Sequence, residues 1–227
     1  MGIRIILLSM LLMLGGCAGQ GFPLENLAKT DIDVVADGHY LEVERILKQL
    51  TVKVYKRNPR FLYLGTGFKG ERTIESRVQQ IFGEPGKLQF EELAVTGAEA
   101  IELALDEQYR GDRVFALMVG LTDMLRQSYG YRPEFFMFSE LDEQKLYLSA
   151  RNLEIAIWRI NTYLDAQKSP LVLTNSRNGE QHNLSYAQLF GKLIALQDML
   201  AIIVAGHNQR VIRTVALNVA SMAFFPL

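Results

Sequence analysis

Cysteine is almost absent from this sequence: Cys17 is the only one among 227 residues. A single thiol excludes a disulfide framework and a cysteine-rich zinc site within the chain. Long apolar runs are lacking too. The apolar segment from Ile5 to Leu14 falls well short of the roughly 20 residues that span a bilayer as a helix. The composition therefore excludes a disulfide-stapled secreted domain, and this segment is too short for a membrane span.

Neither sign of charge predominates. The chain has 24 Lys and Arg against 25 Asp and Glu, a net charge of −1. A nucleic-acid-binding domain would show a basic excess, so that class of function is excluded. The sequence contains no visible repeat or low-complexity tract. Its 49% hydrophobic and 22% charged residues are typical of a folded globular domain rather than a disordered stalk.

The cysteine ends the stretch Leu14-Gly15-Gly16-Cys17, directly behind the apolar segment that follows Arg4. A basic residue, a short apolar core and small residues at the end are the layout of an export signal. This stretch resembles the signal peptide of bacterial lipoproteins. The resemblance implies cleavage behind Gly16, a diacylglyceryl group on Cys17 and acylation of its amine, and two such attachments give stable anchoring. The alternative is an ordinary secretory signal with an incidental cysteine.

This resemblance divides the chain into a signal peptide of residues 1–16, a lipidated tether of residues 17–30 and a domain of residues 31–227. The tether reaches at most about 45 Å when fully extended, so the domain must stay close to its membrane. Ala18, rather than Asp, follows the cysteine, which resembles the signal that lets lipoproteins leave the inner membrane. We therefore expect a lipid-anchored protein on the periplasmic side of the outer membrane.

Apolar residues recur at three- and four-residue spacings through most of the domain. This periodicity predicts seven helices, over residues 32–57, 71–82, 97–109, 112–129, 140–167, 186–205 and 208–224. Four of them begin with a Ser or Thr followed three residues later by an acid or Gln, as in a capping box: Thr30, Thr96, Ser139 and Ser185. Short connections favour a single all-α domain, a bundle or an orthogonal array, with at most one small hairpin near residues 171–184.

Motifs for catalysis are sparse. Residues 65–70 have the glycine spacing of a dinucleotide-binding turn, but no second strand follows, so a loop between helices is expected. His39 and Glu42 lie among further acids and can share a helix face as metal ligands, although a solvated acidic face explains the same residues. Nucleophile signatures such as Gly-x-Ser-x-Gly and His-Glu-x-x-His are missing. We expect no enzymatic activity, no metal and no cofactor.

One candidate interaction surface is basic. Lys56, Arg57 and Arg60 stand beside aromatic residues near the end of the first predicted helix. Such a patch suits an anionic lipid headgroup or a glycan. A solvated helix end, favoured by the helix dipole, accounts for the same residues.

The other candidate surface is an aromatic connection, residues 129–138, which Gly130 and Pro133 keep out of helical structure. Its aromatic residues include Tyr131, Phe135, Phe136 and Phe138. Aromatic side chains in such a connection serve either as anchors for a partner or as plugs of the core. The sequence leaves both interpretations open.

The last residues, 223–227, read Ala-Phe-Phe-Pro-Leu and are too hydrophobic for a free tail. We expect the final predicted helix to pack through Val215, Val219, Met222 and Phe225 against the helix over residues 186–205. The alternative is that residues 224–227 insert into a partner or the bilayer surface.

These features predict a non-enzymatic lipoprotein that binds or positions another component of the cell envelope, above all a protein complex. An alternative is a carrier of lipid or another small apolar molecule, because the segment from Met199 to Ala205 is apolar nearly all round. A third hypothesis is an enzyme that acts on envelope glycan or lipid. The membrane itself is expected as a partner only through the N-terminal lipid.

Overall fold

The computed structural model describes residues 29–64, 72–136, 141–175, 184–215, 219–220 and 223–227. Within these residues the protein is all-α, as predicted. The elements are α2 (Asp31–Arg57), η3 (Pro59–Tyr63), α3 (Ile74–Phe82), α4 (Gly97–Ala104), α5 (Arg113–Ser128), α6 (Glu143–Thr162) and α7 (Ser185–Asn208). No strand is assigned in the described part of the chain, where only two isolated bridges occur.

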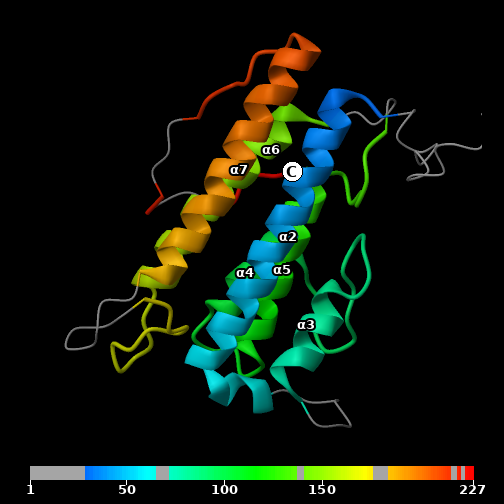
Figure 1. Ribbon diagram of the computed structural model, residues 1–227. Helices are drawn as coiled ribbons and strands as arrows, with labels where there is room; N and C mark the ends of the chain where they lie inside the picture. The colour runs from blue at the N-terminus through cyan, green and yellow to red at the C-terminus, as the bar shows by residue number, and fades with distance from the viewer. Residues whose placement is uncertain (1–28, 65–71, 137–140, 176–183, 216–218, 221–222) are drawn as a thin grey trace, which may run out of the picture.

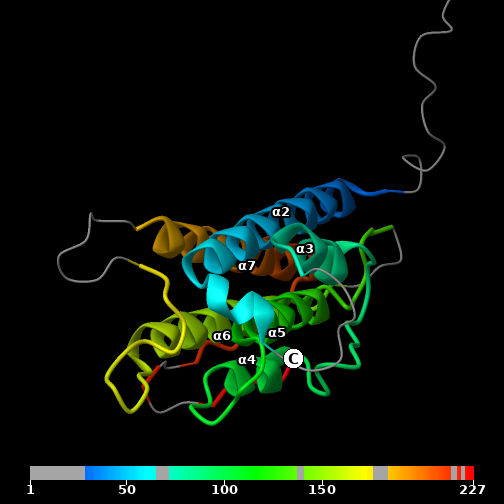
Figure 2. The same cartoon turned by 90° about the horizontal axis from the view of Figure 1, so that it is seen from below.

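The helices are arranged in layers (Figure 2). α2 and α7 lie side by side on one face with α3 next to α2, α5 and α6 lie beneath them, and α4 packs against α5. α2 and α7 are antiparallel, because the hydroxyl of Tyr186 at the start of α7 donates to the carbonyl oxygen of Lys53 near the end of α2, at 2.8 Å. The long helices thus run from one end of the domain to the other (Figure 1).

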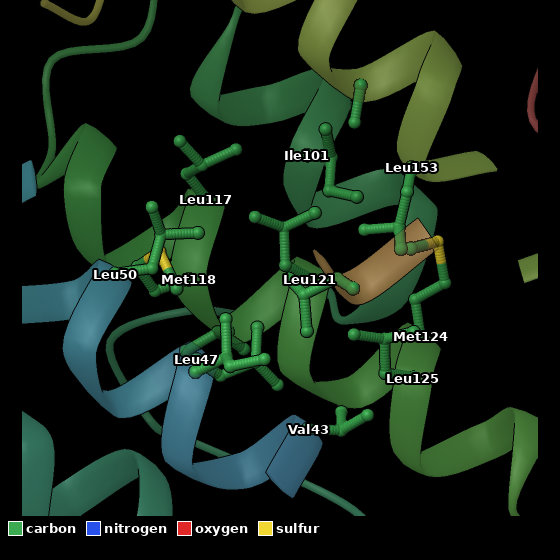
Figure 3. Close-up of a cluster of buried hydrophobic side chains, with 14 of the residues drawn as sticks. Val43, Leu47, Leu50, Ile101, Leu117, Met118, Leu121, Met124, Leu125 and Leu153 are labelled. Atoms are coloured by element: carbon green, nitrogen blue, oxygen red, sulfur yellow. The ribbon is translucent and has the colours of Figure 1, made fainter. Parts of the chain in front are cut away.

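The centre of the core is α5, in which 15 of 16 residues are buried. Figure 3 shows its Leu117, Leu121 and Leu125 among side chains from α2, α4 and α6. The three- and four-residue spacing of its apolar residues would bury one side of a helix, but α5 is buried on all sides. α4 comes especially close: a Cβ at Gly120 would lie 2.7 Å from the carbonyl oxygen of Gly97. Only glycine fits this contact.

One of the four predicted capping boxes is confirmed. Thr30 caps α2, with the Thr30 side chain and the Asp33 carboxylate each accepting from the other's backbone N–H. The boxes at Thr96 and Ser185 are wrong: Thr96 makes no side-chain capping bond, and Ser185 is already inside α7. Ser139 lies outside the described residues, and α6 begins behind a carboxylate instead of a hydroxyl.

The predicted final helix is wrong. α7 ends where Gln209 takes a left-handed conformation, with φ of 54°. The described residues that follow, 210–215, 219–220 and 223–227, are not helical and are called the C-terminal strap. Side-chain amides of α6 satisfy its backbone. Asn152 accepts from the N–H of Phe225 at 2.7 Å and donates to its carbonyl oxygen at 2.9 Å, and Gln144 does the same for Arg213.

The strap still packs on the domain, as the sequence predicted, but against α5 and α6 rather than α7. Phe224 and Leu227 are partly buried against the core. The guanidinium of Arg159 on α6 lies 4.6 Å from the centre of the Phe224 ring, and Gln127 on α5 donates to the carbonyl oxygen of Leu227 at 2.9 Å. The C-terminal residues are therefore packed on the domain, but the predicted helical packing through Val215, Val219, Met222 and Phe225 against residues 186–205 is wrong. Met222 lies outside the described residues.

The described residues of the segment 171–184, which was predicted as a small hairpin, do not form one. Residues 171–175 form no strand, and residues 176–183 lie outside the described part of the chain. The segment is held instead by Asn58 at the end of α2. Its side chain donates to the carbonyl oxygen of Leu173 and accepts from the N–H of the same residue, each at 2.8 Å.

Candidate functional site

Some sequence-predicted residues lie outside the described part of the chain. They are the lipidation residue Cys17, Phe138 of the aromatic connection and residues 65–70 with the dinucleotide-like glycine spacing. The remaining candidates fall at two opposite ends of the domain. α2 spans 27 residues, about 40 Å at 1.5 Å per residue, so the basic patch at its end and the aromatic connection beside its start do not form one surface.

The start of α2 is joined to the aromatic connection. Lys29 forms an ion pair with Asp37, and its ammonium lies 4.9 Å from the centre of the Phe136 ring. Asp37 in turn accepts a hydrogen bond from the N–H of Phe135 at 2.8 Å. These contacts fix the connection to the end of the domain at which the N-terminal tether arrives.

The aromatic connection divides between core and surface. Phe135 is 1% exposed, and its ring centre lies 6.0 Å from that of Tyr129, so Phe135 is a core residue and its prediction as a contact residue is wrong. Phe136 is exposed. Tyr131 is half-buried, has a φ of 59° and donates its hydroxyl to Asp123 at 3.3 Å. Gly130 and Tyr131 both have left-handed backbone conformations, which end α5 and begin the connection.

Apolar side chains are exposed on α2 and α7 at this same end of the domain. They are Val34, Val35 and Leu41 on α2 and Met199, Ile202 and Ile203 on α7, each between 37% and 66% exposed. We call them the α2–α7 apolar face. The His39 imidazole lies close to the backbone of Leu196 on α7, which opposes the lowering of its pKa by burial. Because the helices are antiparallel, Val35, one turn before His39, lies level with the segment that follows Leu196 on α7.

α7 is the one helix in the described part of the chain that is long and apolar enough to cross a membrane by length and composition. In the structure it packs along both α2 and α6 (Figures 1 and 2). Only 44% of its most apolar 18-residue stretch is buried. The segment that the sequence shows as apolar nearly all round is therefore only partly buried. Leu200 and Val204 are in the core, while Met199 and Ile202 are exposed.

A cavity of about 420 Å³ lies between α2, the turn after α3 and the aromatic connection. Its charged floor is already paired. Arg126 is 2% exposed, pairs with Glu44 at 2.7 Å and donates to the carbonyl oxygen of Glu84 at 2.9 Å. Burial raises the pKa of the neighbouring Tyr40 hydroxyl to about 12. These contacts tie α2, α5 and the turn together.

The basic patch lies at the far end of α2. Lys56 and Arg60 are exposed and Arg57 is half-buried. The Arg60 guanidinium lies 4.7 Å from the centre of the Phe61 ring in η3. Arg60 also lines a second cavity, of about 530 Å³, which is formed with residues near the start of α5 and the turn after α6.

A buried charge network was not predicted. Asp112 accepts from the hydroxyl of Tyr55 at 2.8 Å and from the N–H of Phe115 at 2.9 Å, while Arg77 lies 3.3 Å from it and also pairs with Glu92. Burial raises the pKa of Asp112 to about 6. The pKa of Glu92 is below its ordinary value. Burial acts to raise this pKa, but hydrogen bonds from Arg77 and Gln80 outweigh burial.

This network joins α2, α3, the residues before α4 and the start of α5, which are far apart in the sequence. The Tyr55 hydroxyl and the carboxylates of Asp112 and Glu92 are all paired, and Arg77 is 1% exposed. A substrate therefore has no access to them, and the network is a structural clamp. Spacing in the sequence contains no signal for it, because the partners Tyr55 and Asp112 are 57 residues apart.

The acidic residues around His39 point to different partners. Asp37 pairs with Lys29, Glu42 with Arg45 at 2.6 Å, and Glu44 with Arg126. Burial lowers the pKa of His39. Among the residues that the structure describes, no group of three or more His, Cys, Asp or Glu side chains is placed to hold a metal ion.

Comparisons with known proteins identify no relative. No protein-family model, no curated protein and no solved structure matches the chain.

Proposed function

We propose that this protein is a lipid-anchored outer-membrane lipoprotein on the periplasmic side, which binds and positions an envelope protein complex without enzymatic activity. Cys17 carries the lipid in this proposal. Twelve steps of the chain separate Cys17 from Lys29 at the start of the described domain, about 42 Å at full extension. The domain therefore works close to the membrane surface, with the tether arriving beside α2.

The α2–α7 apolar face is the observation that supports a binding role. Six large apolar side chains remain exposed at one end of two packed helices. Burying one such side chain is worth about 1.5–3 kcal/mol, so leaving several in water is costly unless another molecule covers them. Exposed apolar surface of this kind typically marks a contact site.

A protein fits this face better than the bilayer does. Helices that lie on a membrane surface carry Lys and Arg around their apolar side. Around this face Asp31 is exposed, and Arg45 is neutralised by Glu42 at 2.6 Å. On α2 the charges next to the face are thus balanced or acidic, which favours a protein partner over anionic headgroups.

The face is tested by placing a charge on it. Ile202→Lys, at a position 66% exposed, should leave folding intact and reduce co-purification of the envelope partner with the lipidated protein. Leu184→Lys is the matched control, because Leu184 is 60% exposed at the other end of α7. Equal co-purification from Ile202→Lys and the parent, with the same set of proteins, would contradict a binding role for this face.

A further inference from the structure

The cavity of about 530 Å³ at the far end of the domain is separate from the α2–α7 apolar face. Three segments that are distant in the sequence form it: η3, the turn between α4 and α5, and the turn after α6. Three arginines line it, Arg60, Arg110 and Arg113. Its volume lies in the range of small-molecule sites.

Arg113 forms the charged wall of the cavity. The residue is 6% exposed, and its guanidinium donates only to backbone carbonyl oxygens, those of Ala104, Asp106, Glu107 and Tyr109, at 2.5–3.0 Å. These bonds end α4 early and shape the turn, but they leave the positive charge without a carboxylate partner. Burial lowers the pKa of Arg113, Asp106 opposes this, and the charges of Arg110 and Arg60 lower it further.

The other two arginines are exposed and available. Within the described part of the chain, neither Arg60 nor Arg110 takes part in an ion pair. Each of the two carboxylates that line the cavity accepts hydrogen bonds from backbone N–H groups through one of its oxygens. Glu107 accepts from the N–H of Ala166 at 2.7 Å, and Asp165 accepts from the N–H of Ser169 at 2.8 Å, so both carboxylates hold the turn after α6 in place.

Gly111 keeps the cavity open on its remaining side. A Cβ at this position would collide with the hydroxyl of Tyr109, whose ring lines the cavity. The glycine thus lets the Tyr109 hydroxyl lie against the backbone, beside the arginines. A hydroxyl and two unpaired guanidinium groups are the donors that recognise the oxygens of an anion.

We propose that this cavity binds a phosphate group. Guanidinium groups pair with phosphate through parallel N–H···O bonds, and Arg60 and Arg110, which come from two separate segments, can bind different oxygens of one phosphate group. The basic patch predicted from the sequence contributes Arg60 to this site, and the other two arginines come from residues 110–113. The phosphate is carried either by a soluble phosphate ester or by a lipid headgroup.

The test uses the full chain in a non-ionic detergent. Glycerol phosphate is titrated while the NMR amide signal of Gly111 is followed, at constant ionic strength. A saturable shift is expected, with a dissociation constant on the order of 1 mM. Arg60→Gln combined with Arg110→Gln should weaken binding roughly tenfold or more, since hydrogen bonds to charged groups are the strong ones. Arg132→Gln, an exposed arginine at the other end of the domain, should bind like the parent.

A second titration identifies the source of the phosphate. Dihexanoyl phosphatidic acid presents the same group on short acyl chains, and dihexanoyl phosphatidylcholine controls for the acyl chains themselves. Tighter binding of the phosphatidic acid indicates a lipid headgroup, and equal binding of the two phosphate esters indicates a soluble ligand. Either result supports the site provided that the double variant loses it. Absence of a saturable shift with both probes, or unchanged binding by the double variant, would overturn the proposal.

Discussion

At the scale of single residues, the buried Asp112 gives the domain an unusual pH dependence. Burial raises its pKa to about 6 from an ordinary 3.8. Between these values the folded state holds a proton that the unfolded state releases. The contribution of Asp112 to the free energy of unfolding therefore falls as pH rises from about 4 to about 6, and it is constant above that.

Asp112→Asn removes this titration while keeping the size of the side chain. Denaturant unfolding of parent and variant should be compared from pH 4 to pH 7. The stability of the parent relative to the variant should decline across this window, by at most about 3 kcal/mol at 1.36 kcal/mol per pKa unit. A difference that stays flat over the whole range would show that the carboxylate is as well stabilised in the fold as in water.

Two glycines with opposite surroundings test how closely α4 and α5 are packed. A Cβ at Gly120 would meet Gly97 at 2.7 Å, so Gly120→Ala must push the helices apart, at a cost of about 1–3 kcal/mol. Gly191, inside α7, has nothing within 4 Å of such a Cβ. Gly191→Ala should stabilise the domain by about 0.5–1 kcal/mol, because alanine favours helix. Chemical denaturation measures both, and equal effects of the two substitutions would refute the close approach.

At the scale of elements, the C-terminal strap depends on side-chain amides of α6. Asn152 is fully buried and satisfies both backbone groups of Phe225. Asn152→Ala breaks two hydrogen bonds, each worth about 0.5–1.5 kcal/mol, and should lower the melting temperature by several degrees. Deletion of residues 223–227 should do the same.

Gln144→Ala is the control for the strap. Gln144 makes the same pair of bonds to Arg213, but in an exposed setting where water replaces them. Its melting temperature should stay close to that of the parent. If Asn152→Ala also melts like the parent, the strap does not contribute to stability and the alternative, insertion of the C-terminus into a partner, gains support.

The helical spacing of apolar residues, together with residues that begin or end helices, predicted most of these elements. α2 and α5 end within about one residue of the expected positions, because Pro59, Asp112 and the turn at Gly130 act locally. The prediction of a final helix was wrong because the apolar spacing of residues 208–224 is also compatible with an extended segment. Side-chain amides of α6 satisfy the backbone of that segment. α4 ended early because Arg113, nine residues beyond Ala104, takes its terminal carbonyl oxygen. Both failures come from partners in other helices.

For the candidate sites too, the sequence predicted local features and missed those that depend on partners in other helices. Local sequence identified exposed groups such as Phe136 and Arg60, which need no partner to be recognised. It could not separate Phe135 from Phe136, because the burial of Phe135 comes from tertiary packing on Tyr129. It also missed the arginine cavity and the buried charge network, whose members meet only after the helices have packed.

At the scale of the whole molecule, two surfaces lie at opposite ends of a layered helical domain. The α2–α7 apolar face and Phe136 lie near the start of α2, and the arginine cavity lies beyond its end. Figure 1 shows that the start and the end of α2 are at opposite ends of the domain. In our proposal the first surface binds an envelope protein near the bilayer, and the second binds a phosphate group farther along the domain. The proposed place of both surfaces relative to the membrane depends on a lipid at Cys17.

The most direct measurement is therefore the intact mass of the protein extracted from its own membranes. The proposal predicts a chain that begins at Cys17 and carries a diacylglyceryl group and an amide-linked acyl chain. Globomycin-type inhibition of signal processing should leave a larger precursor, and Cys17→Ser should carry no lipid. A chain that begins elsewhere, or that begins at Cys17 without lipid, would contradict the account.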